Sequence, residues 1–103
     1  MVERRIDGYA QLQWLSESKG GRKELPIGQY YAANIRFGDD ERLWSVLILF
    51  SGEAPNEMRS QFVGLAFLFR ENLENELSVG KRISIYEGPT KLVAEGKILS
   101  LNE

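Results

Sequence analysis

The sequence predicts an all-β fold, either a sandwich or a small barrel. Three observations support this prediction. Short apolar runs recur along the 103 residues, Gly, Asp, Asn and Pro separate them, and only one short segment has a helical pattern. A barrel is favoured over a sandwich, because closing the sheet removes the unpaired edges that such apolar strands would otherwise expose.

Six strands are expected. The first two are apolar runs separated by the stretch SKGGRKELPIG, and the third follows FGDDERLW, in which Gly38 and two aspartates suit a hairpin turn. The third and fourth runs, WSVLILF and FVGLAFLF, are apolar on both faces, so they are expected to be central strands covered on both sides. The predicted ranges are 8–15, 29–37, 43–50, 62–70, 81–87 and 92–101.

The segments after the third strand follow the same reasoning. SGEAPNEMRSQ has no period and is predicted to be a loop. In ENLENELS, residues 71–78, Leu73 and Leu77 lie four apart and predict one short helical turn, which needs tertiary packing to form. KRISIYEG alternates, with Ile83 and Ile85 on one face, as expected for a half-buried strand. The last apolar run, residues 92–101, is the sixth predicted strand.

Composition indicates one ordinary globular domain over residues 1–103. Hydrophobic residues make up 43% of the chain and charged residues 27%, and the net charge of −2 gives no strong attraction to nucleic acid or acidic lipid. The first residues are charged where a signal peptide would be apolar, and the longest apolar stretch is too short to span a bilayer. A cytoplasmic protein without a membrane partner is therefore expected.

The chain contains no His and no Cys. The commonest general base, the best nucleophile and the usual zinc ligands are therefore missing. Asp39, Asp40 and Glu41 supply oxygen ligands, but a hairpin tip explains this acidic run better than a cation site does. We expect a protein that is not an enzyme, with no catalytic residue, no metal and no cofactor.

The stretch GGRK holds the candidate anion-binding residues. Gly20 and Gly21 let backbone N–H groups converge on an anion, and Arg22 adds a bidentate donor. The alternative, favoured for an isolated Gly-Gly-Arg, is a structural turn in which the glycines supply positive φ and the basic residues are solvated. Tyr30 and Tyr31 are consecutive and point to opposite faces, so one of them is a candidate for contact with a partner.

Taken together, these segments resemble the C-terminal β-barrel, the third domain, of bacterial elongation factor Tu. LQWLSESKGGRKELPIG stands where that family has a strand, a polar turn, Gly-Gly-Arg and a nearby Pro, and YYAANIRF stands for the Tyr-containing strand that follows. KRISIYEGPTKLVAEGKIL matches the closing strands, with Glu87 and Gly88 in the Glu-Gly position. The resemblance covers nearly the whole chain and implies a six-stranded antiparallel barrel.

In that family the barrel contacts aminoacyl-tRNA, the GTPase domain and the exchange factor. The resemblance implies RNA contact at the matching positions, where Lys23 replaces a His and Asn34 replaces a Gln: Arg22, Lys23, Asn34, Glu87 and Gly88. Residues 30–33 read YYAA where the family has Gly-Tyr-Arg-Pro. With no GTPase domain beside the barrel, GTP is not expected as a ligand.

Two functions follow as expectations. The first is a non-catalytic module that binds another protein, of the toxin-immunity or the translation-adaptor type, with Tyr31 and the matched positions as candidate contacts. The alternative is binding of tRNA-like RNA through the Gly-Gly-Arg and Glu-Gly loops. Because 13 basic residues face 15 acidic ones, there is no net drive from counterion release, and the protein partner is expected first.

Overall fold

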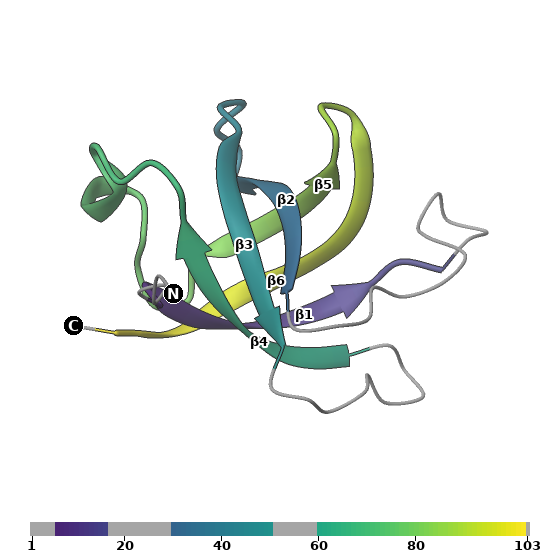
Figure 1. Cartoon of the computed structure of the whole chain (residues 1–103), viewed down its shortest axis with the longest axis horizontal. Coiled ribbons are helices and arrows are strands. Elements are labelled where there is room, and N and C mark those ends of the chain that lie inside the picture. Colours follow the sequence, from purple (N-terminus) through teal and green to yellow (C-terminus); the bar gives the residue numbers. More distant parts are fainter. Residues whose placement is uncertain (1–5, 17–29, 51–59, 103) are drawn as a thin grey trace.

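The computed structural model describes residues 6–16, 30–50 and 60–102. Apart from one 3-10 turn, η2 (Leu73–Asn75), the regular elements of this part of the chain are all strands (Figure 1). They are β1 (Gly8–Trp14), β2 (Tyr30–Phe37), β3 (Trp44–Phe50), β4 (Ser60–Phe67), β5 (Arg82–Glu87) and β6 (Lys91–Leu101).

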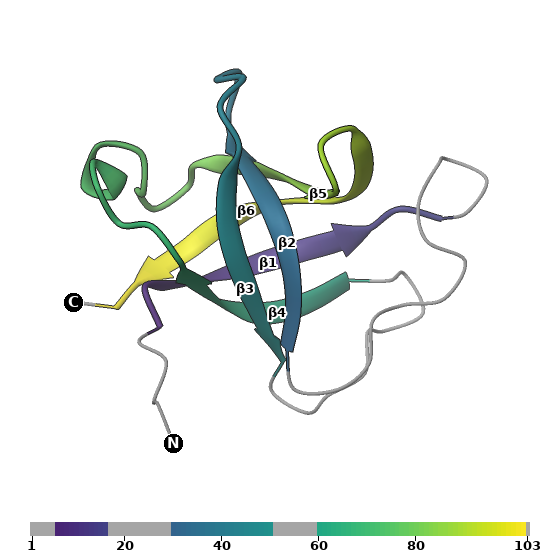
Figure 2. The same ribbon diagram turned by 45° about the horizontal axis from the view of Figure 1, so that its top comes forward.

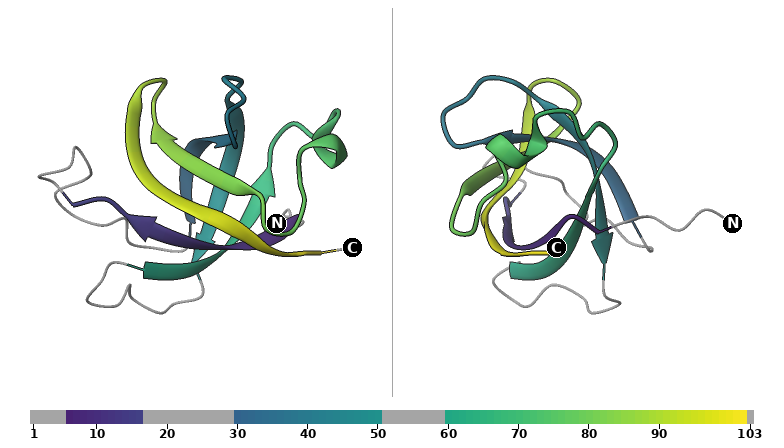
Figure 3. Two further views of the ribbon diagram at one scale, coloured as in Figure 1. Left: turned by 180° about the vertical axis from the view of Figure 1, so that it is seen from behind. Right: turned by 90° about the vertical axis from the view of Figure 1, so that its left-hand side faces the viewer.

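The six strands form one closed antiparallel barrel in the order β1-β4-β3-β2-β5-β6, and β6 pairs with β1 to close it. Figure 2 shows β2 and β3 crossing in front of β1, β4 and β6, and the right-hand view of Figure 3 shows the strands around a common centre. The predicted all-β barrel of six strands is confirmed. Closure leaves each strand with one inner and one outer face.

Alternate residues of each strand fill the barrel. Trp14 and Phe37 are the largest of the fully buried side chains. A Leu or Ile buried to this extent contributes about 1.5–3 kcal/mol to folding. The remaining core residues are aliphatic or aromatic and come from all six strands and η2: Ala10, Leu12, Ile35, Trp44, Val46, Ile48, Val63, Leu65, Phe67, Leu73, Ile83, Ile85, Val93, Ala94 and Ile98.

The fourth strand and the helical segment differ from their predicted bounds. β4 begins at Ser60 and ends at Phe67, and one further backbone hydrogen bond follows it, from Leu68 N–H to the carbonyl of Ser45 (3.1 Å). Within residues 71–78 only η2 is helical, and it starts after Asn72, which has a left-handed φ of 65°. The prediction that Leu73 and Leu77 share one face is confirmed, because Leu73 is buried in the core and Leu77 packs against it.

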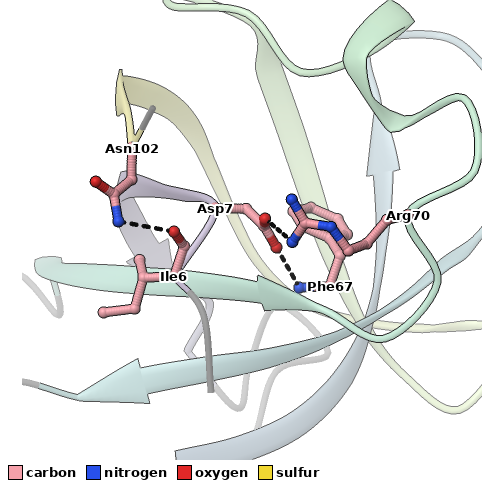
Figure 4. A network of polar contacts seen from close by, with 5 residues as sticks. All are labelled: Ile6, Asp7, Phe67, Arg70 and Asn102. Carbon is pink, nitrogen blue, oxygen red and sulfur yellow. Dashed lines mark hydrogen bonds and ion pairs between the residues drawn. The ribbon is translucent and has the colours of Figure 1, made fainter. Parts of the chain in front are cut away.

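A buried acidic residue fastens the start of β1 to the ends of β4 and β6 (Figure 4). One carboxylate oxygen of Asp7 accepts the backbone N–H of Phe67 (2.9 Å), and the other is paired with Arg70. Asn102 adds a hydrogen bond from its Nδ2 to the carbonyl of Ile6 (2.9 Å). Because a buried carboxylate is costly without such partners, this network stabilises the junction between the start of β1 and the ends of β4 and β6.

Candidate functional site

Four of the six predicted contact residues meet at one corner of the barrel. The hydroxyl of Tyr31 donates to Glu87 Oε1 (2.8 Å), and Asn34 Nδ2 donates to the carbonyl of Gly88 (2.9 Å). These two hydrogen bonds join β2 to the end of β5 and to the turn that follows it. The other two predicted contacts, Arg22 and Lys23, and the predicted turn glycines Gly20 and Gly21 lie outside the described residues.

The residues around this corner hold it in place. Tyr31 packs edge-on against Trp14, with ring centroids 6.0 Å apart, and Glu87 forms an ion pair with Lys91 (3.6 Å). Gly88 has a φ of 69°, a conformation that favours glycine and lets the chain turn from β5 into β6. The side-chain groups that the resemblance assigns to RNA contact therefore also have a structural role in the fold.

The acidic run of the sequence lies in the hairpin between β2 and β3, as expected. Gly38 has a φ of 55°, and Asp40 Oδ1 accepts the backbone N–H of Arg42 (2.9 Å), which stabilises the turn. Across residues 6–16, 30–50 and 60–102, no group of three His, Cys, Asp or Glu residues is placed to hold a metal ion.

A surface pocket of about 640 Å³ opens beside η2. Leu73, Leu77 and Leu101 form its apolar wall, and Asp7 and Arg70 form its charged part. These two charges neutralise each other in the ion pair that joins the start of β1 to the segment after β4. The two charged groups that meet in this pocket thus have a structural role in the fold.

A second surface was not predicted as a site. We call the outward-facing residues Tyr9, Tyr30, Leu49, Phe62 and Gly64 the apolar face. Pairing places four of them in one row across the sheet: Tyr30 is opposite Leu49, Leu49 is opposite Gly64, and Gly64 is opposite Tyr9. The ring of Phe62 stacks on that of Tyr9 (centroids 5.5 Å apart, planes 7° apart).

The apolar face is exposed where its aromatic rings lie. Phe62 is 47% exposed and Tyr30 is 61% exposed, although both are large apolar side chains on regular strands. Gly64, within the row, is buried, and the side chain of Ile6 lies over it. No charged residue belongs to the row, so this outer surface has the composition of an interface core rather than of ordinary solvent-exposed sheet.

The sequence did contain a signal for this face. WSVLILF and FVGLAFLF were predicted to be covered on both sides, and this interpretation is correct only in part. Leu47 and Ala66 are buried although they lie outside the core cluster, whereas Phe62 on the same outer face of β4 is largely exposed. In a closed barrel the second apolar side of a strand faces outward, where a partner can cover it.

Comparison with known proteins identifies no relative. No model of a known protein family matches the chain, and no curated protein sequence matches it. Within the described residues, no helix has the length and apolar character that crossing a membrane requires. The barrel architecture is therefore what classifies the protein: a closed antiparallel β-barrel of six strands.

Proposed function

We propose that the protein is a non-catalytic binding module that acts by contact with another protein, and that the apolar face is its docking surface. The exposed, stacked pair formed by Tyr9 and Phe62 carries this proposal. Aromatic side chains are enriched in the cores of protein interfaces and supply a large share of the binding free energy there. A rigid strand scaffold holds these rings in place, so little side-chain entropy is lost when a partner covers them.

The proposed partner presents an apolar surface of its own, because the row from Tyr30 to Tyr9 contains no charge for a polar partner to recognise. The resemblance to the third domain of elongation factor Tu supports a partner of this class, since that barrel packs against protein domains. A toxin neutralised by the barrel and a component of the translation machinery both satisfy this description. The absence of His and Cys from the sequence supports action by contact rather than by catalysis.

RNA binding through the Gly-Gly-Arg and Glu-Gly loops stays the alternative prediction, and it has less support. Of its described residues, Asn34 uses its amide donor on Gly88 and Glu87 brings a negative charge to the surface that would meet phosphate. The net charge of −2 also gives no overall attraction to a polyanion.

The proposal is tested by site-specific photo-crosslinking. A benzophenone amino acid replaces Phe62 in one variant and Phe69 in a matched control, because Phe69 is also an exposed aromatic residue (71%) but lies after β4, away from the apolar face. We expect one protein to be captured from lysate of the source organism at position 62 and not at position 69. Equal capture at both positions, or capture of RNA alone, contradicts the proposal.

A further inference from the structure

The first half of β2 has a neighbouring strand on one side only. β2 pairs with β3 over Tyr30–Ile35, but it pairs with β5 only over Asn34–Phe37. Within residues 6–16, 30–50 and 60–102, no strand pairs with the other side of residues 30–33. We call this unpaired side of residues 30–33 the open edge of β2.

The main-chain groups of Tyr30 and Ala32 point to the open edge. In an antiparallel sheet the N–H and C=O groups of successive residues face opposite neighbours. Gly38 N–H donates to the carbonyl of Arg82 at the start of β5 (2.8 Å), so the even-numbered residues of β2 face the side on which β5 lies. Pairing with β5 begins only at Asn34. Two N–H donors and two C=O acceptors of β2 therefore have no strand partner in the described part of the chain.

A side chain ends the pairing of β2 with β5. If the register continued, Gly88 would lie opposite Ala32, but the carbonyl of Gly88 accepts a hydrogen bond from Asn34 Nδ2 instead (2.9 Å). Gly88 also has a φ of 69°, and Pro89 after it has no N–H to donate. The chain turns at these residues into β6. β5 therefore does not extend to the open edge.

The open edge lacks the features that usually keep a strand edge from pairing with another chain. Such edges carry a charged residue, a Pro or a bulge. Residues 30–33 read YYAA, and their pairing with β3 is regular, without a register shift. Tyr30 is 61% exposed, and Ala32 is exposed as well. The two residues whose main-chain groups point to the edge are thus accessible to another extended chain.

We propose that the open edge of β2 is a second docking surface, which binds an extended segment of a partner protein by strand addition. The segment continues the line of β5 beyond Gly88, and its main-chain groups form hydrogen bonds with those of Tyr30 and Ala32. An extended polypeptide fits this edge because its own donors and acceptors repeat at the spacing of those in β2. The contact goes beyond the proposed function, since it uses main-chain groups and not the aromatic rings of the apolar face.

The residues of the open edge also define the side chains of the bound segment. Side chains on one face of adjacent strands lie beside each other, so the outward residues of the segment contact Tyr30 and Ala32. Neither of these residues carries a charge, and the small side chain of Ala32 leaves room for a larger neighbour. We therefore expect an uncharged segment with aromatic or β-branched residues at its outward positions.

The test selects a ligand from a random heptapeptide library displayed on phage, with the purified protein as bait. An enriched peptide is synthesised with a fluorescent label, and its dissociation constant is measured by anisotropy. Ala32→Pro removes the N–H that faces the open edge and keeps the bonds to β3, which come from the odd-numbered residues. We expect it to weaken binding by about tenfold or more, whereas the matched control Ala32→Ser keeps the N–H and binds as the natural protein does. No enriched peptide, or equal binding by Ala32→Pro, overturns the proposal.

Hydrogen exchange followed by NMR tests the same contact without any substitution. In the free protein we expect the N–H of Ala32 to exchange faster than that of Ala33, which faces β3, and the bound peptide to slow exchange at Ala32 by about tenfold or more. Unchanged exchange at Ala32 would place the peptide elsewhere and overturn the proposal. An N–H of Ala32 already protected in the free protein, by a second copy if the protein sediments as a dimer, would also overturn it. Phe62 is unchanged throughout, so the two proposals fail independently.

Discussion

The rings of Tyr9 and Phe62 stack on the outside of the barrel, where their planes differ by 7° and their centroids are 5.5 Å apart. They come from β1 and β4, which are neighbours in the sheet although they are far apart in the sequence. Stacking of this kind stabilises a protein by about 0.5–1.5 kcal/mol beyond the burial of its surface. The pair therefore joins two strands and at the same time presents a flat aromatic surface to solvent.

Replacing Phe62 by Ala is expected to lower the free energy of unfolding by about 1 kcal/mol, because the half-exposed ring loses its stacking contact with Tyr9. Urea denaturation measures this change. Phe69→Ala, the control, is expected to change stability by less than about 0.5 kcal/mol. A loss of several kcal/mol at Phe62 would place its side chain in the core and contradict the exposed stack.

The ion pair of Asp7 with Arg70 is expected to respond asymmetrically to substitution. Asp7 has only 2% of its side chain exposed, whereas Arg70 is 45% exposed. Arg70→Met leaves a buried carboxylate without its cation and should cost about 3 kcal/mol. Asp7→Asn keeps an acceptor for Phe67 N–H and leaves Arg70 to water, so it should cost about 1 kcal/mol.

Chemical denaturation of both variants and of the double variant measures this asymmetry. The double variant should cost less than the sum of the two single ones, because the two side chains interact. If Asp7→Asn lowers the free energy of unfolding more than Arg70→Met does, then Arg70 does not compensate the charge of Asp7.

Gly96→Ala is expected to destabilise the barrel by about 3 kcal/mol or more, because the added Cβ would lie 2.0 Å from the carbonyl oxygen of Gln11 and would push β6 away from β1. Gly88→Ala is the matched control. It has open space around it but a φ of 69°, so about 1 kcal/mol is expected. Thermal unfolding compares the two, and equal losses would contradict the close approach at Gly96.

Lys97→Glu is expected to raise the free energy of unfolding by up to about 1 kcal/mol, since it places a carboxylate opposite Arg82. Lys91→Glu makes the same change of charge where an ion pair with Glu87 already exists, and it should lower stability by about 0.5 kcal/mol. Unfolding in urea at low salt measures both effects. If both variants raise the free energy of unfolding, or both lower it, then the like charges of Arg82 and Lys97 do not destabilise the barrel.

Much of the fold was predictable from the sequence because the strands carry clear local signals. β5 alternates with Ile83 and Ile85 inward, and the Gly38 turn ends β2 where the pattern indicates. The helical pattern of 71–78 was misleading in extent, since a segment this short takes its conformation from tertiary contacts, and only Leu73–Asn75 is helical. The end of β4 at Phe67 was not predicted either, because the apolar run continues through Leu68 and Phe69, which are exposed.

The sites were harder to predict, because they depend on pairing between distant segments. Asn34 and Gly88 were grouped only through the resemblance to a family, and the contact itself spans 54 residues. Arg82 meets Lys97 because of the register of β5 and β6, which an irregularity between Ile85 and Tyr86 shifts. The apolar face could not be predicted for another reason. Where both sides of a strand are apolar, there is no alternation of apolar and polar residues to tell which side faces out.

The most direct test of the proposed docking surface is the dissociation constant of the complex with the protein captured at position 62, measured by calorimetry with purified components. Phe62→Ser is expected to weaken binding by about tenfold or more, as loss of a central aromatic contact does, while Phe69→Ser leaves the constant unchanged. Binding should also change little between low and moderate salt. An unchanged dissociation constant for Phe62→Ser, in a variant that remains folded, would show that the apolar face is not where the partner binds.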